Sequence, residues 1–301
     1  MTYLPDGVDI NKLLDDLRIS SWTACDILLN YSQIIINEQY DSNFIKVKNN
    51  NEPVTLADLE VHDIFINSFH NKYSDIDWEI LSEETINNES INQKKDNWVW
   101  ILDPVDGTKD FIQGTNHFSV HFALIYKKKP LIGVVLIPSK NELWISNGEN
   151  VWCENREGLI KNINLSNIKN LKDMTIVTSK NHRNESLKDL IQKINFKKSI
   201  SMGSIGCKIA SILRGEADLY LSLSLPGQSA PKDWDFAAPE VILRNAGGAI
   251  TNIDNEDLSY LGVNFRQEGL IIASNNRNNH KNICLEIKKI IKENNLYELI
   301  N

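Results

Sequence analysis

Apolar residues recur at helical spacing over the first part of the chain. Between Asp9 and about Asn37 they fall three or four positions apart, at Ile10, Leu13, Leu14, Leu17, Ala24, Ile27, Leu28, Tyr31 and Ile35. This spacing predicts a long amphipathic helix. A polar loop follows, and the sequence Val54-Thr-Leu-Ala-Asp58 then opens a second predicted helix. Thr55 and Asp58 fit a capping box at its start, with Asp in place of Glu.

A short apolar run, from Trp98 to Leu102, leads directly into acids at Asp103 and Asp106. Its aromatic and branched side chains predict a buried strand. A carboxylate at the end of such a strand would lose its hydration unless something compensated its charge. Asp103 and Asp106 are three positions apart and are expected to lie on a tight turn, where both can face one point. With the Gly-Thr that follows, they indicate a metal ion facing a phosphate. A turn with capping acids is an equal alternative on residue chemistry alone.

The remaining pattern predicts strands and helices in two halves. A short strand is predicted at 78–82 and is followed by Glu83 and Glu84. Two adjacent glutamates can also be ordinary solvent-exposed residues without a functional role. Further strands are predicted at 118–126, 131–137, 142–146, 174–178, 198–201, 217–223 and 269–274. Further helices are predicted at 185–195, 206–214, 235–246 and 282–294. Asp235 is the predicted N-cap of the third of these helices.

The fold class predicted from this order is α/β, with layered helices and sheets. The first half is expected to span residues 1–161 and the second half residues 162–301. No linker rich in Pro, Gly or Ser separates them, so we expect the two halves to pack as one compact unit.

Composition narrows the class of protein. The chain has 301 residues, of which 42% are hydrophobic and 24% charged, as is ordinary for a globular protein. A net charge of -8 argues against nucleic-acid polymers or anionic membranes as partners. No signal peptide is expected, because the N-terminus has no basic region followed by an apolar stretch. No transmembrane segment is expected, because the longest apolar run, 131–137, is too short to span a bilayer. Four scattered cysteines predict reduced thiols and a cytoplasmic protein.

The acidic stretch favours a hard cation. Mg²⁺ binds oxygen ligands and combines a few carboxylates with substrate phosphate. A calcium-binding EF-hand does not fit, because Gly114 occupies the twelfth position from Asp103, where that loop needs a bidentate Glu. A DxDxT phosphatase nucleophile does not fit either, because two residues separate Asp103 from Asp106.

Several motifs together resemble one superfamily. They are Val54-Thr-x-x-Asp58, Ser82-Glu-Glu84, Asp103-Pro-Val-Asp-Gly-Thr108, Trp234-Asp-x-Ala-Ala238 and Ala246-Gly-Gly248. In this order they resemble the inositol monophosphatase-like superfamily of Mg²⁺-dependent, lithium-sensitive phosphatases. The resemblance runs from the first helix to beyond Gly248. It implies a sugar-phosphatase-type sandwich of alternating α-β-α-β-α layers and hydrolysis of a phosphomonoester by an attacking water.

The resemblance also implies a metal site. Glu83, Asp103 and the backbone carbonyl of Val105 would hold one Mg²⁺. Asp103, Asp106 and Asp235 would hold a second, with Asp103 bridging the two ions. A third Mg²⁺ is possible.

The same resemblance assigns catalytic and substrate contacts. Asp58 would accept a hydrogen bond from Thr108, and Thr108 with Glu83 would position the attacking water. The residues around the reacting phosphate would be Glu83, Val105, Asp106, Gly107, Thr108 and Asp235.

Four further residues concern the choice of substrate. With Lys109, the sequence Asp106-Gly-Thr-Lys-Asp-Phe111 is similar to the motif of the 3′(2′),5′-bisphosphate nucleotidase (CysQ-type) branch. His182 resembles part of that branch's Ser-x-x-His segment, and Ser204 with Lys208 resembles its Gly-Ser-x-x-Lys element with one extra residue. As an equal alternative to substrate binding, His182 is an exposed loop residue and Lys208 is a solvated residue on a helix. Ser222 departs from the pattern, because the nucleotidases commonly carry Arg there and the inositol enzymes Glu.

The expected function is hydrolysis of adenosine 3′,5′-bisphosphate to AMP and phosphate, a step that serves sulfur metabolism. The alternatives are an inositol monophosphatase or a fructose-1,6-bisphosphatase-like sugar phosphatase. A non-enzymatic binding module is a remote alternative, because all four carboxylates and Thr108 are present. The expected partner is a small phosphorylated substrate, and the expected assembly is a monomer or a homodimer.

Overall fold

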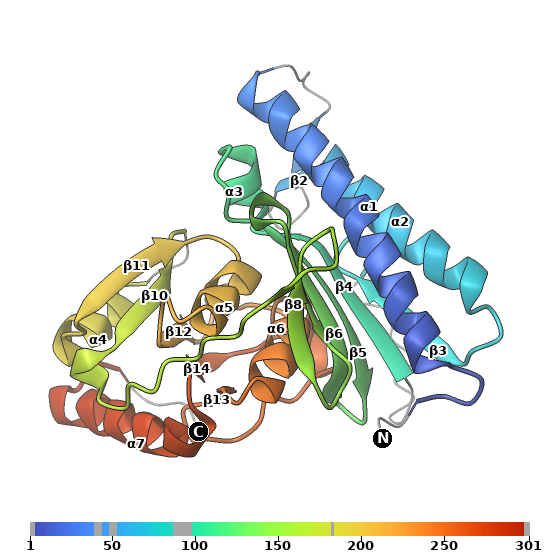
Figure 1. Cartoon of the computed structure of the whole chain (residues 1–301). Helices are drawn as coiled ribbons and strands as arrows, with labels where there is room; N and C mark the ends of the chain where they lie inside the picture. The colour runs from blue at the N-terminus through green and yellow to red at the C-terminus, as the bar shows by residue number, and fades with distance from the viewer. Residues whose placement is uncertain (1–3, 39–43, 48–52, 87–97, 182–183, 298–301) are drawn as a thin grey trace.

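Helices and sheets alternate in five layers in the computed structural model of the chain, which describes residues 4–38, 44–47, 53–86, 98–181 and 184–297 (Figure 1). An outer helical layer holds α1 (Ile10–Ile36) and α2 (Leu56–Lys72). A seven-stranded sheet separates it from a middle layer of α5 (Ile205–Leu213) and α6 (Asp233–Asn245). A five-stranded sheet follows, covered by α4 (Glu185–Ile194) and α7 (Arg277–Asn294). The predicted α-β-α-β-α sandwich is confirmed.

The seven-stranded sheet follows the order of the chain. Its strands are β3 (Trp78–Ser82), β4 (Trp98–Asp106), β5 (Ser119–Tyr126), β6 (Lys129–Ile137), β7 (Glu142–Ser146), β8 (Val151–Glu154) and β9 (Ile160–Lys161). β3 pairs with β4 in parallel, and the other neighbours pair antiparallel. The hairpin turn between β5 and β6 is made at Lys127 and Lys128, both of which have positive φ.

The five-stranded sheet has a mixed order. It runs β11 (Lys198–Met202), β10 (Thr175–Ser179), β12 (Leu219–Ser224), β14 (Gly269–Ser274) and β13 (Ala249–Asn252). The first three strands are parallel, and β14 is antiparallel to both of its neighbours. The remaining elements are the β1–β2 pair (Ile45–Val47, Pro53–Thr55), the short helix α3 (Thr108–Ile112) and 3₁₀ turns at Pro138–Lys140, Leu171–Asp173 and Val263–Phe265.

Weakly patterned segments account for most differences from the predicted elements. The short strands β1, β2, β8, β9 and β13 were not predicted, because two to four residues cannot establish a periodicity. The last helix begins at Arg277, before the predicted start at 282, because the Asn276 side chain caps it by accepting from the backbone N–H groups of Asn278 and Asn279.

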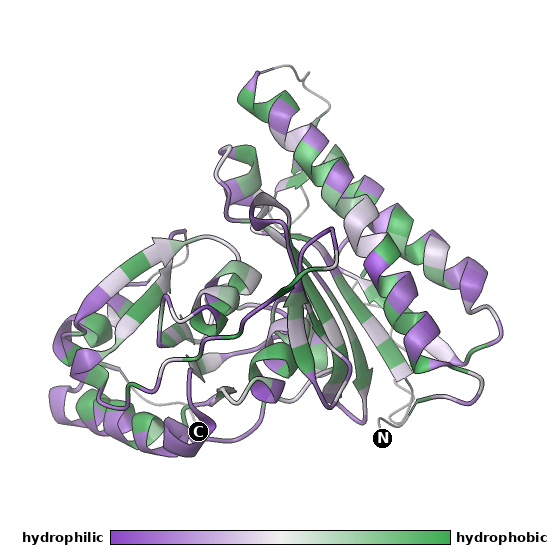
Figure 2. Ribbon diagram, viewed as in Figure 1, coloured by the Kyte–Doolittle hydropathy of each residue, from purple (hydrophilic) through white to green (hydrophobic). Residues whose placement is uncertain are grey.

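Three hydrophobic cores lie between the five layers, and the alternation along β4 places it between two of them. Trp100 and Leu102 belong to the core under α1 and α2. Ile101, on the opposite face, belongs to the core around α5 and α6. Figure 2 shows the strands of the large sheet as mostly hydrophobic, whereas α7, which packs on one face only, alternates hydrophobic and hydrophilic residues.

The middle helices touch both sheets. The core around α5 and α6 includes Val135 from the large sheet and Tyr220 and Ala273 from the small one. The division of the chain into halves at residues 161 and 162 stays a prediction. Among the described residues, no helix has the length and apolarity that crossing a membrane requires.

Gly133 on β6 allows α6 to approach the large sheet closely. A Cβ added at this position would lie 2.7 Å from a methyl carbon of Val241 and 3.1 Å from the Cα of Ala238. Both contacts belong to α6, and a backbone atom cannot move aside as the end of a flexible side chain can. The spacing between β6 and α6 therefore depends on the missing side chain.

Gly133→Ala is expected to lower the free energy of unfolding by about 1–3 kcal/mol, because overpacking forces α6 away from the sheet. Urea unfolding followed by circular dichroism measures this change. Gly262→Ala is the matched control, since nothing lies within 4 Å of its added Cβ. Equal stability of the two variants would contradict the proposed tight packing.

Candidate metal and phosphate site

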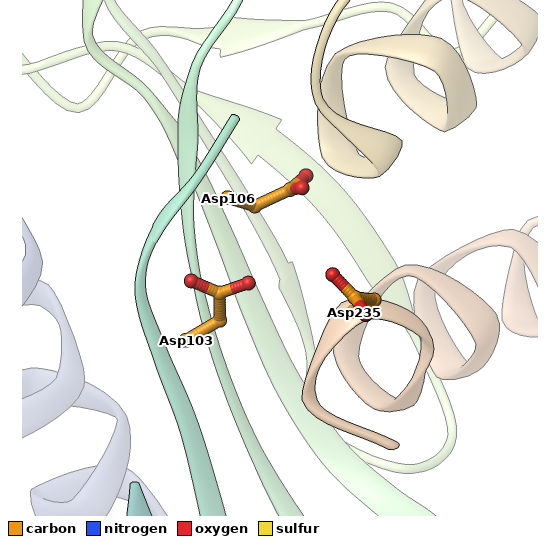
Figure 3. A group of neighbouring side chains, drawn as sticks. All are labelled: Asp103, Asp106 and Asp235. Atoms are coloured by element: carbon orange, nitrogen blue, oxygen red, sulfur yellow. The ribbon is translucent and has the colours of Figure 1, made fainter. Parts of the chain in front are cut away.

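Three carboxylates converge where the large sheet meets the middle helices. Asp103 and Asp106 come from β4 and Asp235 from the first turn of α6 (Figure 3). Each offers one oxygen, and these oxygens all lie within 4.8 Å of one another. Asp103 is 1% exposed and Asp106 is 7% exposed. The structure thus brings together three of the residues expected to bind metal.

A β-bulge directs both acids of β4 to the same face. Residues three apart in a regular strand point to opposite faces. Here Asp103 pairs with His121 and Asp106 with Ser119, so β4 holds one more residue than β5 between these pairs. The expected tight turn after Asp103 was wrong, because the strand continues through the bulge to Asp106.

Electrostatic repulsion makes this cluster unfavourable without a cation. Burial raises the pKa of Asp103 well above its usual range, and the charges of Glu83, Asp106 and Asp235 raise it further. The donors are all carboxylate oxygens, which are the ligands that Mg²⁺ prefers. The residues present therefore fit a divalent cation, held by these carboxylates.

Glu83 lies just outside the three-carboxylate cluster. Its backbone N–H donates to the carbonyl of Leu102 at 3.0 Å, which places it beside Asp103. After burial, the negative charge of Glu83 has the largest effect in raising the pKa of Asp103. The carbonyl oxygen of Val105, the other expected ligand, lies 3.0 Å from the Thr108 hydroxyl oxygen and competes with Asp58 for its single hydrogen. The metal-binding roles of Glu83 and Val105 stay predictions.

Asp235 occupies the third position of its helix. The prediction of Asp235 as N-cap was wrong, since the N-cap is Lys232 and α6 begins at Asp233. The Asp235 carboxylate accepts a hydrogen bond from the backbone N–H of Lys232, as the acid of a capping box does. An acid at the third position still faces the helix N-terminus, which explains why the motif resembled a cap.

Gly107 and Thr108 connect β4 to α3. Gly107 has a φ of +93°, and an added Cβ would lie 2.8 Å from the carbonyl oxygen of His117, so only glycine fits. The Thr108 hydroxyl lies 3.2 Å from a carboxylate oxygen of Asp58, so the expected hydrogen bond is present. The other oxygen of Asp58 accepts from the backbone N–H and hydroxyl of Thr55, which completes the predicted capping box.

The environment of Asp58 changes its acidity. Burial raises the pKa of Asp58 to about 7, the Thr55 hydrogen bonds oppose this, and the negative charges of Glu84 and Glu83 add to it. A carboxyl group with such a pKa exchanges protons readily near neutral pH. Asp58 is therefore equipped to accept a proton through Thr108.

Asp106 is held by donors from two other elements. Its Oδ2 accepts from the Ser204 hydroxyl at 2.6 Å and from the Gly206 backbone N–H at 3.0 Å. Ser204 also caps α5, because its hydroxyl oxygen accepts from the backbone N–H of Cys207. The structure thus places Ser204 against a metal-binding candidate, and its contact with substrate stays a prediction.

Sequence reasoning missed Ser119 and His121. Both lie on β5 directly opposite the two acids of β4, and both are buried. The available signal was a pair of polar residues two positions apart in an apolar strand, which puts both on one buried face where they need partners.

Lys208 is the buried cation of the site. It lies on α5, is 3% exposed, and its Nζ is 5.3 Å from the ring centroid of Tyr220. Burial lowers the pKa of Lys208, and the charge of Asp106 opposes this. Among the described residues, none accepts a hydrogen bond from its ammonium group. The solvated-helix alternative for Lys208 is therefore wrong.

The structure says less about Lys109 and His182, the other two residues expected to bind substrate. Lys109 is exposed on α3, next to Thr108. His182 lies outside the described residues. The nearby Asn181 donates from its side chain to a carboxylate oxygen of Asp110 at 2.7 Å, which ties the end of β10 to α3.

Comparison with known sequences identifies the family. The model of the inositol monophosphatase family matches residues 16–292, so the chain belongs to this family. It is 31% identical over 253 residues to the 3′(2′),5′-bisphosphate nucleotidase CysQ of Buchnera aphidicola, which covers 83% of this chain and 88% of that protein. It is 30% identical over 213 residues to CysQ of Escherichia coli, covering 71% and 81%. It is also 29% identical over 241 residues to the Nus factor SuhB of Vibrio cholerae, covering 76% and 80%.

Solved structures share the fold. The suhB protein of Bartonella henselae has a TM-score of 0.72 and 21% identity, with 94% of this chain and 99% of that chain covered. The SaIMPase-II structures bound to inositol monophosphate and to 2′AMP have TM-scores of 0.69 and 0.66 at 20% and 19% identity. The former covers 95% of this chain and 96% of that one, and the latter 94% and 98%. Family membership and the acidic cluster together support a Mg²⁺-dependent phosphatase.

Asp103→Asn is expected to abolish Mg²⁺-dependent phosphatase activity and to raise the melting temperature measured in EDTA. The second effect follows because the substitution removes a carboxylate whose ionised form is disfavoured in the folded protein. Thermal unfolding with and without Mg²⁺ measures both states. Retained activity, or a lower melting temperature in EDTA, would contradict this account of the cluster.

Proposed function

We propose that this protein is a 3′(2′),5′-bisphosphate nucleotidase that converts adenosine 3′,5′-bisphosphate to AMP and phosphate. The observation that carries this choice is Lys208, a buried cation without a hydrogen-bond acceptor among the described residues. An anionic group on the substrate would supply that acceptor, and a bisphosphate has one more such group than an inositol monophosphate. The CysQ relatives at about 30% identity support the same choice.

The reaction needs one water and one phosphomonoester, and yields an alcohol and inorganic phosphate. Bound Mg²⁺ ions would supply an activated water and neutralise charge on the phosphate oxygens. Asp103, Asp106 and Asp235 would hold them, with Glu83 and the Val105 carbonyl as the further proposed ligands.

The protein's own groups orient the attacking water. The Thr108 hydroxyl can donate its hydrogen to Asp58, so its oxygen lone pairs can accept a hydrogen bond from water. Asp58, with a pKa of about 7, can take up the proton that the water loses through this pair. Glu83 is proposed to hold the other side of the water.

The phosphate is expected to lie over the turn at Gly107. The absence of a side chain there lets the backbone approach phosphate oxygens closely. Lys109 next to this turn, Lys208, and His182 are the proposed contacts to the rest of the substrate. Ser222 carries no charge to select between a nucleotide and an inositol, so we assign this selection to the lysines.

The location and physiological context belong to the same proposal. All four cysteines are free and buried, which fits a reducing compartment such as the cytoplasm. Clearance of adenosine 3′,5′-bisphosphate would place the enzyme in sulfur metabolism, and the sensitivity of the superfamily to lithium is expected here too.

Initial rates of phosphate release with Mg²⁺ test the substrate. The compounds to compare are adenosine 3′,5′-bisphosphate, inositol 1-phosphate and fructose 1,6-bisphosphate. We expect kcat/KM to be highest for the nucleotide, because only it presents a second phosphate on a nucleoside. A clear preference for either of the other two compounds would overturn the nucleotidase assignment and leave the phosphatase class intact.

Lys208→Met tests the residue that carries the choice. A charge-assisted hydrogen bond contributes about 1.5–3 kcal/mol, so kcat/KM for adenosine 3′,5′-bisphosphate is expected to fall by about 10- to 100-fold. The rate with 3′-AMP, which lacks the 5′-phosphate, is expected to change little. An equal loss with both compounds would argue that Lys208 acts at the reacting phosphate or the metal ligands, and not on substrate choice.

A further inference from the structure

His121 touches every element that supplies the three-carboxylate cluster. It lies on β5, is 1% exposed, and pairs across the strands with Asp103. Its Nε2 lies 3.3 Å from the Oδ2 of Asp106. Its Nδ1 lies 3.2 Å from the backbone carbonyl of Trp234, the residue before Asp235.

The hydrogen-bond partners define how the ring is oriented. A carbonyl oxygen can only accept, so Nδ1 carries a hydrogen and donates it to Trp234. In this tautomer Nε2 has no hydrogen, so it accepts a hydrogen bond from the Ser119 hydroxyl 2.8 Å away and packs against Asp106 without a hydrogen bond. One edge of the imidazole therefore contacts Trp234 on α6, and the other contacts Asp106 on β4 and Ser119 on β5.

The surroundings leave the ring no room to turn. A Cβ added to Gly206, at the start of α5, would lie 2.4 Å from Nε2 and 2.4 Å from the Ser119 hydroxyl oxygen. The Ser119 hydroxyl is in turn 2.7 Å from that of Ser204, which donates to Asp106. α5, β5 and α6 thus enclose the imidazole behind Asp106.

We propose that His121 is a positioning residue that holds Asp106 and the Asp235-bearing helix at the spacing a divalent cation needs. This inference rests on the proposed metal site, and it assigns to His121 a part of the affinity for Mg²⁺. Groups that orient metal ligands typically change affinity by about 10- to 100-fold when removed. A purely structural core histidine would change stability and leave metal affinity as it was.

The test measures Mg²⁺ affinity without relying on activity. A ligand that binds the folded protein raises its melting temperature in a concentration-dependent way. The rise follows ln(1 + [Mg²⁺]/Kd), so fitting it gives the half-saturating Mg²⁺ concentration, at which half of the folded protein is bound. This concentration is determined for the wild type and for His121→Phe, which removes both nitrogens. We expect this concentration to increase by about 10- to 100-fold in the variant.

Two smaller changes separate the two edges of the ring. In His121→Asn the amide lies near the position of Nδ1 and can keep the bond to Trp234. In His121→Gln it lies near the position of Nε2 and can keep the contact with Asp106 and Ser119. Each variant is expected to give a half-saturating concentration between those of the wild type and His121→Phe. If His121→Phe fails to fold, these two variants test the effect of His121 on Mg²⁺ affinity.

His280→Phe is the matched control. His280 is also 1% exposed and also has both ring nitrogens engaged, by the Ser274 and Thr251 hydroxyls, but it lies on α7. Its replacement is expected to lower the melting temperature in EDTA and to leave the half-saturating Mg²⁺ concentration unchanged.

Three results would overturn the inference. One is a half-saturating concentration that stays at the wild-type value in every His121 variant that folds. Another is an equal change in His280→Phe, which would mean that lost stability alone moves the readout. If the melting temperature of the wild type itself does not rise with Mg²⁺ concentration, the proposed metal site fails and this role for His121 fails with it.

Discussion

Repulsion among buried carboxylates is the constraint on which this structure depends. Asp103, Asp106 and Asp235 lie within a few ångströms of one another at the junction of a sheet and a helix. Folding alone cannot make this arrangement favourable, because burial and the charges of its neighbours both disfavour the ionised form of Asp103. The protein supports it with fixed donors: Ser204 and Gly206 for Asp106, and a backbone N–H for Asp235. Such a site is built for a cation, whose charge offsets the repulsion.

Much of the fold was predictable because each layer leaves its own period in the sequence. The long helices and buried strands have strong patterns, whereas β8, β9 and β13 are too short to show one. The acids of β4 were found because carboxylates at the end of an apolar run need an explanation. The reason they act together, an extra residue in β4 opposite β5, depends on strand pairing and is not visible in one sequence.

The same limit applies to the supporting residues. His121 is meaningful only once β5 is paired with β4 and α6 is packed beside it, and a list of motifs cannot supply those contacts. Lys208 was visible as a lysine but not as a buried one. Asp235 was predicted as the N-cap and lies three positions further into the helix, and its motif still identified it. The sequence therefore identifies candidate functional residues, whereas their burial and their contacts with one another depend on how the layers pack.

The position of α6 in the chain has a consequence for synthesis on the ribosome. All seven strands of the large sheet are made before α5 and α6, which cover the face that carries Ile101 and Asp103. A nascent chain therefore presents an uncovered apolar face with two acids until residues 205–245 have emerged. The metal site therefore cannot assemble until α6 has been made, and a chain truncated before α6 would keep this face of the sheet exposed.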